Sequence, residues 1–597
     1  MTLLFDIETT EIGPNGEMPD KVHCIVVSDD VGEQKVYHDD PSLKRSGTLF
    51  EGAQRLSTHS GHIVAHNLLG FDLLVLNKLF PQLTFERIHD TFLLSQMFYA
   101  NEMQRHSIYE WGTRVNAMKP DHEDWTKLSE DMIKRCKVDV EILRRIWVKY
   151  LEPYAQREAY QPAIQLEYDV MKVFNKTDGW MNVDRSLIER GISRLTRYKD
   201  LLQRQLIKNF KPVVAATGEI TKPLKKDGAP NTRVVGWAES VGVDPATIRG
   251  PYTKFDTHEI NLNSSKQVTS QLLSLGWKPD SFTPAGSPKI SDSRFHGLCG
   301  SIKKYLEKYN SIKTRLGVLT SWHNKSETGR IQGRHKTCGT NTGRWRHGVI
   351  ANVPKVSVFM GELMRKVFVA EPGHYLVGCD AAQLEARLIG HYTYNFDGGK
   401  YADFLLNEDV HTFNANLWGV DRGIAKGGGF AIEFGCFPKK LSLILGCSVK
   451  DAKKHWDAYW DARPACKKLK KVLTDVVDKR SGGVDDLAIS RAYIKGLDGR
   501  PLYVRAKHKL VNTLIQAAGA ILMKKAYVLL DKKLEPLGAN ILILYHDEFV
   551  IQVPDNVDPQ IVRDLAEQSI VDAGKHFNLN IDMAAESAAG QNWAEIH

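Results

Sequence analysis

The chain has 597 residues, of which 42% are hydrophobic and 25% are charged, and its formal net charge is +9. This length suits roughly three to five domains, and the mildly basic balance permits a polyanionic partner without requiring one. The eight cysteines contain no C-x-x-C pair and no long apolar run opens the chain, which argues against a zinc site, a disulfide framework, secretion and membrane insertion.

The first 165 residues alternate short apolar runs with helical patterns, which predicts an α/β domain. Asp6 and Glu8 lie two residues apart in the strand-like stretch LLFDIETT, so their side chains share one face. Asp72 follows a turn at Gly70, and Asp139 falls on a predicted helix. Such acids can jointly hold divalent cations, although an exposed strand that carries two acids explains the first pair equally well.

Two long basic helices are predicted next, within 191–210 and 302–319, because apolar residues recur there at helical spacing between lysines and arginines. The intervening residues 211–259 contain the lysine-rich stretch TKPLKKDGAP and show little periodicity. This composition predicts an exposed insertion.

From residue 335 onward, apolar strands lead into acids. HYLVGCD ends at Asp380 and precedes a helical pattern, while LILYHDEFVIQV is interrupted by Asp547 and Glu548. A continuous strand would push one of these two neighbouring carboxylates into the core, at a cost of several kcal/mol. A chain reversal at His546-Asp547 avoids this cost and predicts a hairpin with acids at its tip. There Asp547 could face Asp380 and share metal ions with it, although helix and turn capping remains the alternative for each acid alone.

Between these acids, the segment DRGIAKGGGFAIEFG places two cations and an aromatic ring at i, i+4 and i+8, which is one face of a helix. The residues are Arg422, Lys426 and Phe430. They could bind a triphosphate and stack on a base, but a solvated helix face often shows the same pattern.

Together these motifs resemble those of the family A DNA polymerases, closest to the replicative enzymes of short-tailed bacteriophages, over nearly the whole chain. The resemblance implies a multidomain α/β and α+β fold, with a ribonuclease-H-like 3'→5' exonuclease domain followed by a right-hand polymerase domain. The implied divisions are the exonuclease domain at 1–165, a thumb at 166–334, the palm at 335–400 and 501–597, and fingers at 401–500. The implied activity is template-directed addition of deoxynucleotides to a primer, with proofreading.

The resemblance also implies roles for individual residues in synthesis. Asp380, Asp547 and the backbone carbonyl of Ala381 would hold two Mg²⁺ ions, with Mn²⁺ as a substitute, and Glu548 would be an auxiliary acid. The implied nucleotide-binding residues are Glu385, His411, Arg422, Lys426, Phe430 and Phe434. Lys426 would also donate a proton to the departing pyrophosphate, and Glu385 would exclude a 2'-hydroxyl. The implied DNA contacts are Arg344, Asn512, Gln516 and His546.

For the exonuclease, the resemblance implies Asp6, Glu8, Asp72 and Asp139 as catalytic acids, with the first two and Asp139 as metal ligands. The chain departs from the family at Arg135, where a tyrosine usually helps to orient water. It departs again at Phe434, often a tyrosine, and at Gly427–Gly429, where three glycines lower helix preference by roughly 3 kcal/mol relative to alanine. The glycines predict mobile fingers that a triple alanine substitution would rigidify.

The implied partners are primer-template DNA and deoxynucleoside triphosphates, with a phage helicase-primase as a further candidate and no membrane. In phage relatives an insertion in the thumb recruits host thioredoxin, and residues 211–259 occupy the corresponding place. They would bind that protein or another processivity factor, or form a flexible loop whose lysines contact duplex phosphates. The implied location is the cytoplasm of an infected bacterium. A single-subunit RNA polymerase and a non-catalytic nucleic-acid-binding protein are the alternatives; Glu385 and the N-terminal acids argue against the first, and the retained acids against the second.

Overall fold

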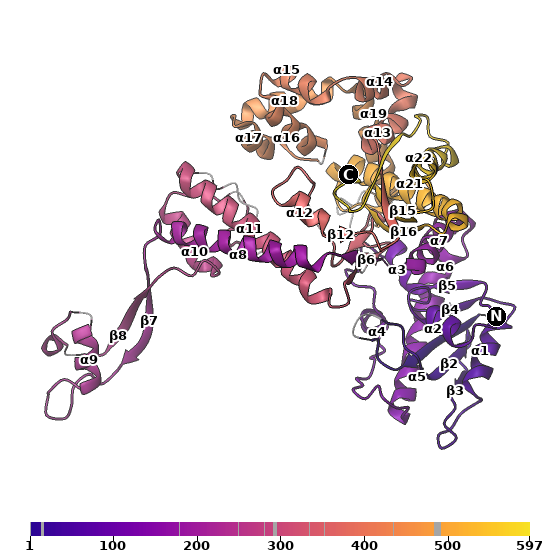
Figure 1. The fold of residues 1–597 in the computed structure, drawn as a ribbon, viewed down its shortest axis with the longest axis horizontal. Helices are drawn as coiled ribbons and strands as arrows, with labels where there is room; N and C mark the ends of the chain where they lie inside the picture. Colours follow the sequence, from indigo (N-terminus) through magenta and orange to yellow (C-terminus); the bar gives the residue numbers. More distant parts are fainter. Residues whose placement is uncertain are drawn as a thin grey trace. The chain divides into compact units, whose positions relative to one another are not determined.

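The structure is a computed structural model, which describes residues 2–13, 17–177, 179–240, 242–248, 250–279, 281–283, 285–290, 295, 297–333, 335–351, 353–433, 435–482 and 491–597. It separates into two compact units (Figure 1). One unit contains residues 1–184 together with Thr328–His597, and the other contains Arg185–Glu327. Each unit is mixed in its secondary structure, as the sequence predicts.

The N-terminal part of the first unit is built on a five-stranded sheet in the order β3-β2-β1-β4-β5. The first three strands pair antiparallel, and β1, β4 and β5 run parallel, which is the topology of the predicted ribonuclease-H-like fold. The strands are β1 (Leu3–Thr9), β2 (Val22–Asp29), β3 (Gln34–Tyr37), β4 (Ile63–Ala65) and β5 (Ile88–Asp90). The helices are α1 (Leu49–Ser57), α2 (Asp72–Leu79), α3 (Thr91–Phe98), α4 (Ile108–Arg114), α5 (Glu130–Ile146) and α6 (Glu152–Ala155).

The C-terminal part of the same unit is built on an antiparallel sheet in the order β16-β17-β13-β18. Its strands are β13 (His374–Ala381), β16 (Asn540–Tyr545), β17 (Glu548–Pro554) and β18 (Ala585–Gly590). The predicted hairpin is confirmed, because β16 and β17 pair antiparallel on either side of a turn at His546-Asp547. The main helices of this region are α7 (Gln161–Thr177), α13 (Leu384–Asp397), α21 (Leu510–Leu534) and α22 (Pro559–His576). Their apolar faces and the sheet form the largest core, in which helix α7 spans the predicted domain boundary at residue 165.

Six described helices follow α13 up to residue 482; α15 to α18 share a core around Trp418 and Tyr459, while α14 and α19 pack in separate clusters (Figure 1). The six helices are α14 (Lys400–Asn407), α15 (Val410–Trp418), α16 (Arg422–Glu433), α17 (Pro438–Leu445), α18 (Val449–Asp461) and α19 (Pro464–Ser481). Smaller elements complete the unit: β6 (Trp180–Val183), β9 (Arg330–Gln332), β10 (His335–Lys336), β11 (Arg346–His347), α12 (Gly361–Lys366), β12 (Phe368–Val369), β14 (Tyr493–Lys495) and β15 (Pro501–Tyr503).

The second unit confirms both predicted basic helices, which are α8 (Arg185–Ile207) and α11 (Gly300–Lys325). Apolar residues of these helices and of α10 (Ser265–Ser274) form its core. The insertion is exposed, as predicted, but it contains regular secondary structure. Strands β7 (Val213–Ile220) and β8 (Tyr252–His258) pair antiparallel, and helix α9 (Thr232–Ser240) lies between them in the chain (Figure 1). Both strands are largely exposed, and this explains why no buried face marks them in the sequence.

One helical stretch, Lys507–Leu537, is long and apolar enough to cross a membrane by length and composition. However, 83% of its most apolar window is buried inside the protein, among the residues that support the C-terminal sheet. Its hydrophobicity is therefore that of a core helix.

Candidate active sites

Two acids that are far apart in the sequence meet at one end of the C-terminal sheet. Asp380 lies at the end of β13, and Asp547 lies in the turn between β16 and β17. The backbone N–H of Ala381 donates a hydrogen bond to the carbonyl oxygen of Asp547 at 3.1 Å, which ties the turn to the strand. His546, at the turn, has a φ of 61°, so the reversal uses a left-handed residue. The sheet therefore brings the two predicted carboxylates to one place.

The charges at this edge are unequally compensated. Glu548 pairs with Asp380 across the sheet but is buried, accepts a hydrogen bond from the Trp593 indole at 2.7 Å and lies 3.4 Å from the Arg365 guanidinium. Burial, followed by repulsion from Asp547 and Glu548, raises the pKa of Asp380 to about 7. The charges of His597 and Lys355 offset this rise only in part, while Glu548 has its own cation in Arg365.

This donor set fits a divalent metal. Carboxylate and carbonyl oxygens are the ligands that Mg²⁺ and Mn²⁺ prefer, and the raised pKa of Asp380 shows an uncompensated need for positive charge. Asp380, Asp547 and the carbonyl of Ala381 could supply the ligands. Arg365 and Trp593, which position Glu548, carried no signal in the sequence.

The predicted phosphate-binding residues also come together, on α15 and α16. Arg422, Lys426 and Phe430 are all exposed along α16, and the rings of His411 and Phe430 lie 5.4 Å apart. Partial burial, and then the charges of Lys426 and Arg422, lower the pKa of His411. These side chains form a basic and aromatic surface that suits a polyphosphate attached to a base.

Asp409 is a member of this surface that the sequence analysis missed. Its carboxylate caps α15 by accepting from the backbone N–H groups of His411 and Thr412 at 3.0 and 3.2 Å. It also accepts from Arg422 Nε at 2.8 Å. The sequence D-x-H-T could have predicted this role, because aspartate is a preferred residue at the N-terminal cap of a helix. Asp409 therefore fixes both the start of α15 and the guanidinium of Arg422.

The three glycines of α16 have a packing role that revises the prediction of mobile fingers. A Cβ at Gly428 would lie 2.8 Å from the Trp418 ring, and one at Gly429 would lie 2.7 Å from Asn414 Nδ2. Asn414 is itself buried and accepts from Arg463 at 2.6 Å. Only Gly427 has room, with its nearest neighbour at 3.7 Å. A triple alanine substitution would therefore force apart a packed helix as well as favour helix formation.

Three of the predicted sugar and DNA contacts, Glu385, Asn512 and Gln516, lie on α13 and α21, while His546 lies in the turn between β16 and β17. Arg344 donates from its guanidinium to Glu385 Oε1 at 3.3 Å, a pairing that the sequence analysis did not foresee. Asn512 and Glu385 line one small pocket, and Gln516 lies one turn farther along α21. Phe434 lies outside the described residues, so the consequence of its missing hydroxyl stays a prediction.

The N-terminal sheet carries a second acidic site, here called the N-terminal cluster, made of Asp6, Glu8, Asp72 and Asp139. Burial, and then the charges of Asp139, Glu8 and Asp72, raise the pKa of Asp6 well above its usual value. Burial also raises the pKa of Glu8 to about 7. The four predicted acids are therefore close enough to repel one another.

Two cations enter the N-terminal cluster. Lys119 forms an ion pair with Asp139, and Arg135 Nε lies 3.4 Å from Glu8 Oε1 while its guanidinium stacks over Trp125. Even so, Glu8 Oε1 and Asp139 Oδ1 are buried without a hydrogen-bond partner in the described part of the chain. Orphaned buried carboxylate oxygens fit a divalent ion. The sequence analysis did not find Lys119, because its ion pair with Asp139 joins a loop to a helix and follows no local spacing.

Cys136 lies beside the same cluster. Its Sγ is 3.5 Å from Asp6 Oδ2, and one ligand atom from each of Asp6, Glu8 and Cys136 lies within 4.8 Å of the others. Burial raises the pKa of this thiol well above its usual value. The thiol is therefore protonated and donates to the Asp6 carboxylate, so the hard ligands of this cluster are its carboxylates.

A sheet that presents paired carboxylates beside a basic, aromatic helix face is the arrangement of a metal-dependent phosphoryl-transfer enzyme. Comparison with known proteins gives the family. Residues 241–595 match the model of the DNA polymerase family A. The chain therefore belongs to DNA polymerase family A, whose members are metal-dependent.

Individual relatives agree over long stretches. The DNA-directed DNA polymerase of Escherichia phage T7 is 24% identical, covering 97% of this chain and 98% of the phage protein. That of Enterobacteria phage T3 is also 24% identical, over the full length of both proteins. The thermostable DNA polymerase I of Thermus aquaticus is 29% identical over 56% of this chain and 42% of its own. The POL domain of Pol1 from M. smegmatis, solved with a DNA primer-template and dNTP, shares the fold, with a TM-score of 0.72 at 16% identity over 99% of this chain and 95% of that one.

A pH dependence follows from the raised carboxyl pKa values in the metal-free protein. Asp380 and Glu8 have native pKa values of about 7 against usual values near 4, so the native state binds more protons between these pH values. Stability is therefore expected to fall as pH rises from about 4 to about 7. Thermal unfolding in EDTA should show this fall, and Asp380→Asn/Glu8→Gln should flatten it. An unchanged pH profile in this variant would contradict the assignment.

Lys119 should compete with metal at the N-terminal cluster. Lys119→Met is expected to strengthen Mn²⁺ binding on the order of tenfold, since unit charges 4 Å apart interact by roughly 1 kcal/mol even in bulk water. Mn²⁺ titration followed by electron paramagnetic resonance measures this without turnover. Lys127→Met, at an exposed position of the same segment, is the control. Equal affinities in both variants would refute the competition.

The glycines of α16 should respond individually to alanine. Gly427→Ala is expected to stabilise the protein by up to about 1 kcal/mol, because it adds helix preference in open space. Gly428→Ala is expected to destabilise it by about 1 to 3 kcal/mol through overlap with Trp418. Urea unfolding compares the two variants. Similar effects of the same sign would show that packing does not decide these positions.

Proposed function

We propose that this family A polymerase extends a primer 3'-end on a DNA template, using Asp380 and Asp547 as the ligands of two Mg²⁺ ions. The observation that carries the proposal is the meeting of these acids at one edge of the sheet, with Ala381 N–H bonded to the Asp547 carbonyl. When bound, the two ions would activate the 3'-hydroxyl and stabilise charge on the departing pyrophosphate. Mn²⁺ would substitute for Mg²⁺, as it accepts the same oxygen ligands.

The chain's own residues would bind and orient the triphosphate. His411, Arg422 and Lys426 neutralise its phosphates, and Phe430 stacks on the incoming base, which agrees with the 5.4 Å spacing of the His411 and Phe430 rings. The primer 3'-oxygen forms a bond to the α-phosphorus while the α–β bridging bond breaks. Lys426 then gives a proton to the departing pyrophosphate. Asp409 holds Arg422 in place for this task.

Sugar selection and DNA contacts would lie on the palm. Glu385 would exclude a 2'-hydroxyl, which favours deoxynucleotides and disfavours RNA synthesis. With Phe434 lacking a hydroxyl, Arg344 is the partner that orients Glu385, at 3.3 Å. Arg344, Asn512, Gln516 and His546 would contact the primer-template, and Glu548 would support the acids from its buried position.

The N-terminal cluster would remove mispaired nucleotides from the primer 3'-end as a 3'→5' exonuclease. Asp6, Glu8 and Asp139 would hold two divalent ions, and Asp72 would complete the site, in agreement with the orphaned oxygens of Glu8 and Asp139. Arg135 takes the place of the family's tyrosine. It contacts Trp125 and Glu8, and from there it would lie near the reacting phosphate.

The proposed organisation follows the family. Residues 1–165 would be the exonuclease, 166–334 the thumb, 401–500 the fingers, and the two segments 335–400 and 501–597 the palm. Working in the cytoplasm of an infected bacterium, the enzyme would use primer-template DNA and deoxynucleoside triphosphates, beside a phage helicase-primase. Residues 211–259, which include this ribbon and helix, would bind host thioredoxin or another processivity factor, or would contact duplex phosphates through their lysines.

Separate substitutions should separate the two activities. Asp547→Ala is expected to abolish primer extension and leave degradation of a single strand, because only the polymerase site loses a ligand. Asp6→Ala/Glu8→Ala is expected to do the reverse. Gel analysis of a labelled primer with and without dNTPs measures both activities in each variant. Loss of both activities in a folded single-site variant would defeat the two-site proposal.

A further inference from the structure

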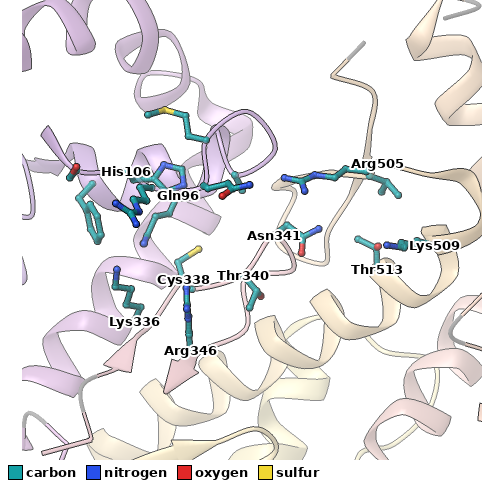
Figure 2. Close-up of a pocket in the computed structure, with 18 residues that line it drawn as sticks. Gln96, His106, Lys336, Cys338, Thr340, Asn341, Arg346, Arg505, Lys509 and Thr513 are labelled. Carbon is teal, nitrogen blue, oxygen red and sulfur yellow. The ribbon is translucent and has the colours of Figure 1, made fainter. Parts of the chain in front are cut away.

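Helix α21 lines two cavities of different chemistry. The larger one, of about 840 Å³, has cations such as Lys336 and Arg505 in its wall and no acid among its described lining residues (Figure 2). The smaller one, of about 40 Å³, lies where α21 and α13 meet helices α14, α16, α18 and α19. Two acids line it, Glu385 of α13 and Glu433 of α16. A nucleotide is too large for this space, but a few water molecules, each of which needs about 10 to 15 Å³, fit it.

Glu385 is held from one direction only. Its Oε1 accepts a hydrogen bond from the Arg344 guanidinium at 3.3 Å, and its side chain is 43% exposed. Among the described residues, none donates a hydrogen bond to its second oxygen, Oε2. A carboxylate that selects a sugar by its position needs its rotamer fixed by further contacts. The small cavity is where a second partner can reach Glu385.

Glu433 lines the same cavity and is fixed by its neighbours. The Tyr459 hydroxyl donates to its Oε1 at 2.9 Å. Tyr459 is 1% exposed, and the Arg463 guanidinium lies 3.8 Å from the centre of its ring. Burial, and to a smaller degree the charge of Glu385, raise the pKa of Glu433. Its carboxyl therefore keeps a proton more readily than a free glutamic acid does, and this proton can be donated.

Arg463 adds an unused donor to the wall of the small cavity. Its side chain is 1% exposed, and its Nε is buried without a hydrogen-bond partner in the part of the chain that the structure describes. Its other nitrogens donate to the Tyr459 carbonyl at 3.2 Å and to Asn414 at 2.6 Å. A buried donor of this kind indicates a polar partner in the cavity, such as an ordered water beside the carboxyl of Glu433.

The two acids are complementary in their hydrogen bonding. Glu385 uses Oε1 toward Arg344, and Glu433 uses Oε1 toward Tyr459, so each acid has Oε2 left. A protonated carboxyl donates to a carboxylate directly or through one water, and such charge-assisted bonds are stronger than neutral ones. Phe434, the next residue in the sequence, has no group that can make this contact.

We propose that Glu433, held by Tyr459, is a positioning residue that donates a hydrogen bond to Glu385 and fixes it for sugar selection. The proposal rests on the proposed polymerase function, and it adds Glu433 and Tyr459 to the residues that distinguish a deoxynucleotide from a ribonucleotide. With this contact, Glu385 is held from α16 as well as from Arg344. Without it, Glu385 can turn away and admit a 2'-hydroxyl.

The test is nucleotide binding to the full chain on a primer-template whose primer ends in a dideoxynucleotide, so that no bond can form. Titration in Mg²⁺ gives the dissociation constants of a ribonucleoside triphosphate and of the deoxynucleoside triphosphate with the same base. The first constant divided by the second measures sugar selection. The variants are Glu433→Leu, Glu433→Gln and Tyr459→Phe. The control is Tyr375→Phe, which removes a different hydroxyl, one that donates to the Val557 carbonyl at 2.8 Å.

Glu433→Leu is expected to lower this ratio about tenfold, because it removes one charge-assisted hydrogen bond. Glu433→Gln should keep the ratio, since its amide N–H still donates to Glu385 and its carbonyl still accepts from Tyr459. Tyr459→Phe should lower the ratio in the unaltered chain but not in Glu433→Leu, because it acts through Glu433. Tyr375→Phe should leave the ratio unchanged.

An unchanged ratio in Glu433→Leu, or an equal loss of affinity for both nucleotides, would overturn the proposal. So would a loss in Glu433→Gln as large as that in Glu433→Leu. Tyr459→Phe removes a single oxygen atom and decides the matter if Glu433→Leu does not fold. Primer extension by the unaltered chain on an unblocked primer is measured in parallel. Its failure would refute the proposed function, whereas the ratio depends on binding alone, so the two failures can be told apart.

Discussion

A buried network of four charges holds the larger unit together. Glu167 of α7 accepts from Lys524 of α21 at 2.6 and 2.7 Å and from Arg500 at 2.6 Å, and Arg500 also pairs with Asp498. All four side chains are at most 4% exposed. The charges of the two acids and the two bases cancel. Removing one of these side chains would leave a buried unpaired charge and would destabilise the protein by roughly 3 to 5 kcal/mol. Because α7 also contributes to both the N-terminal and the C-terminal cores, this network fixes the helix that the two sheets share.

The two acidic sites meet the same electrostatic problem in different ways. At the edge of the C-terminal sheet, Arg365 compensates Glu548, while His597 and Lys355 offset the raised pKa of Asp380 only in part, so positive charge is still wanting there. In the N-terminal cluster, Lys119 and Arg135 already bring positive charge to Asp139 and Glu8. Metal there must displace or share these contacts. The two acidic sites can therefore differ in their affinity for metal although both consist of carboxylates.

The sequence predicted those parts of the molecule that local rules determine. Two adjacent acids in an apolar run forced a reversal at His546-Asp547, because burying a free carboxylate costs more than a turn does. The i, i+4 spacing placed Arg422, Lys426 and Phe430 on one helix face for a similar local reason. The sequence analysis did not find Lys119, Arg365 and Trp593, because each of them contacts an acid that is distant in the sequence. The sequence analysis also did not predict the strands β7 and β8. They pair with each other and bury few of their side chains, so their sequences show no amphipathic pattern.

The exposed cations and the clustered carboxylates lie in different parts of the molecule. Salt and metal ions would therefore act on different groups. Exposed cations lie along α16, while carboxylates gather at the edge of the C-terminal sheet and in the N-terminal cluster, where nearby cations compensate them only in part. Because DNA is negatively charged, carboxylates repel it and exposed cations attract it. Salt weakens the attraction between DNA phosphates and exposed cations, because it screens the charges and its ions compete for the phosphates. A divalent ion bound by the carboxylates would reverse the local charge there and allow a phosphate to approach the acids.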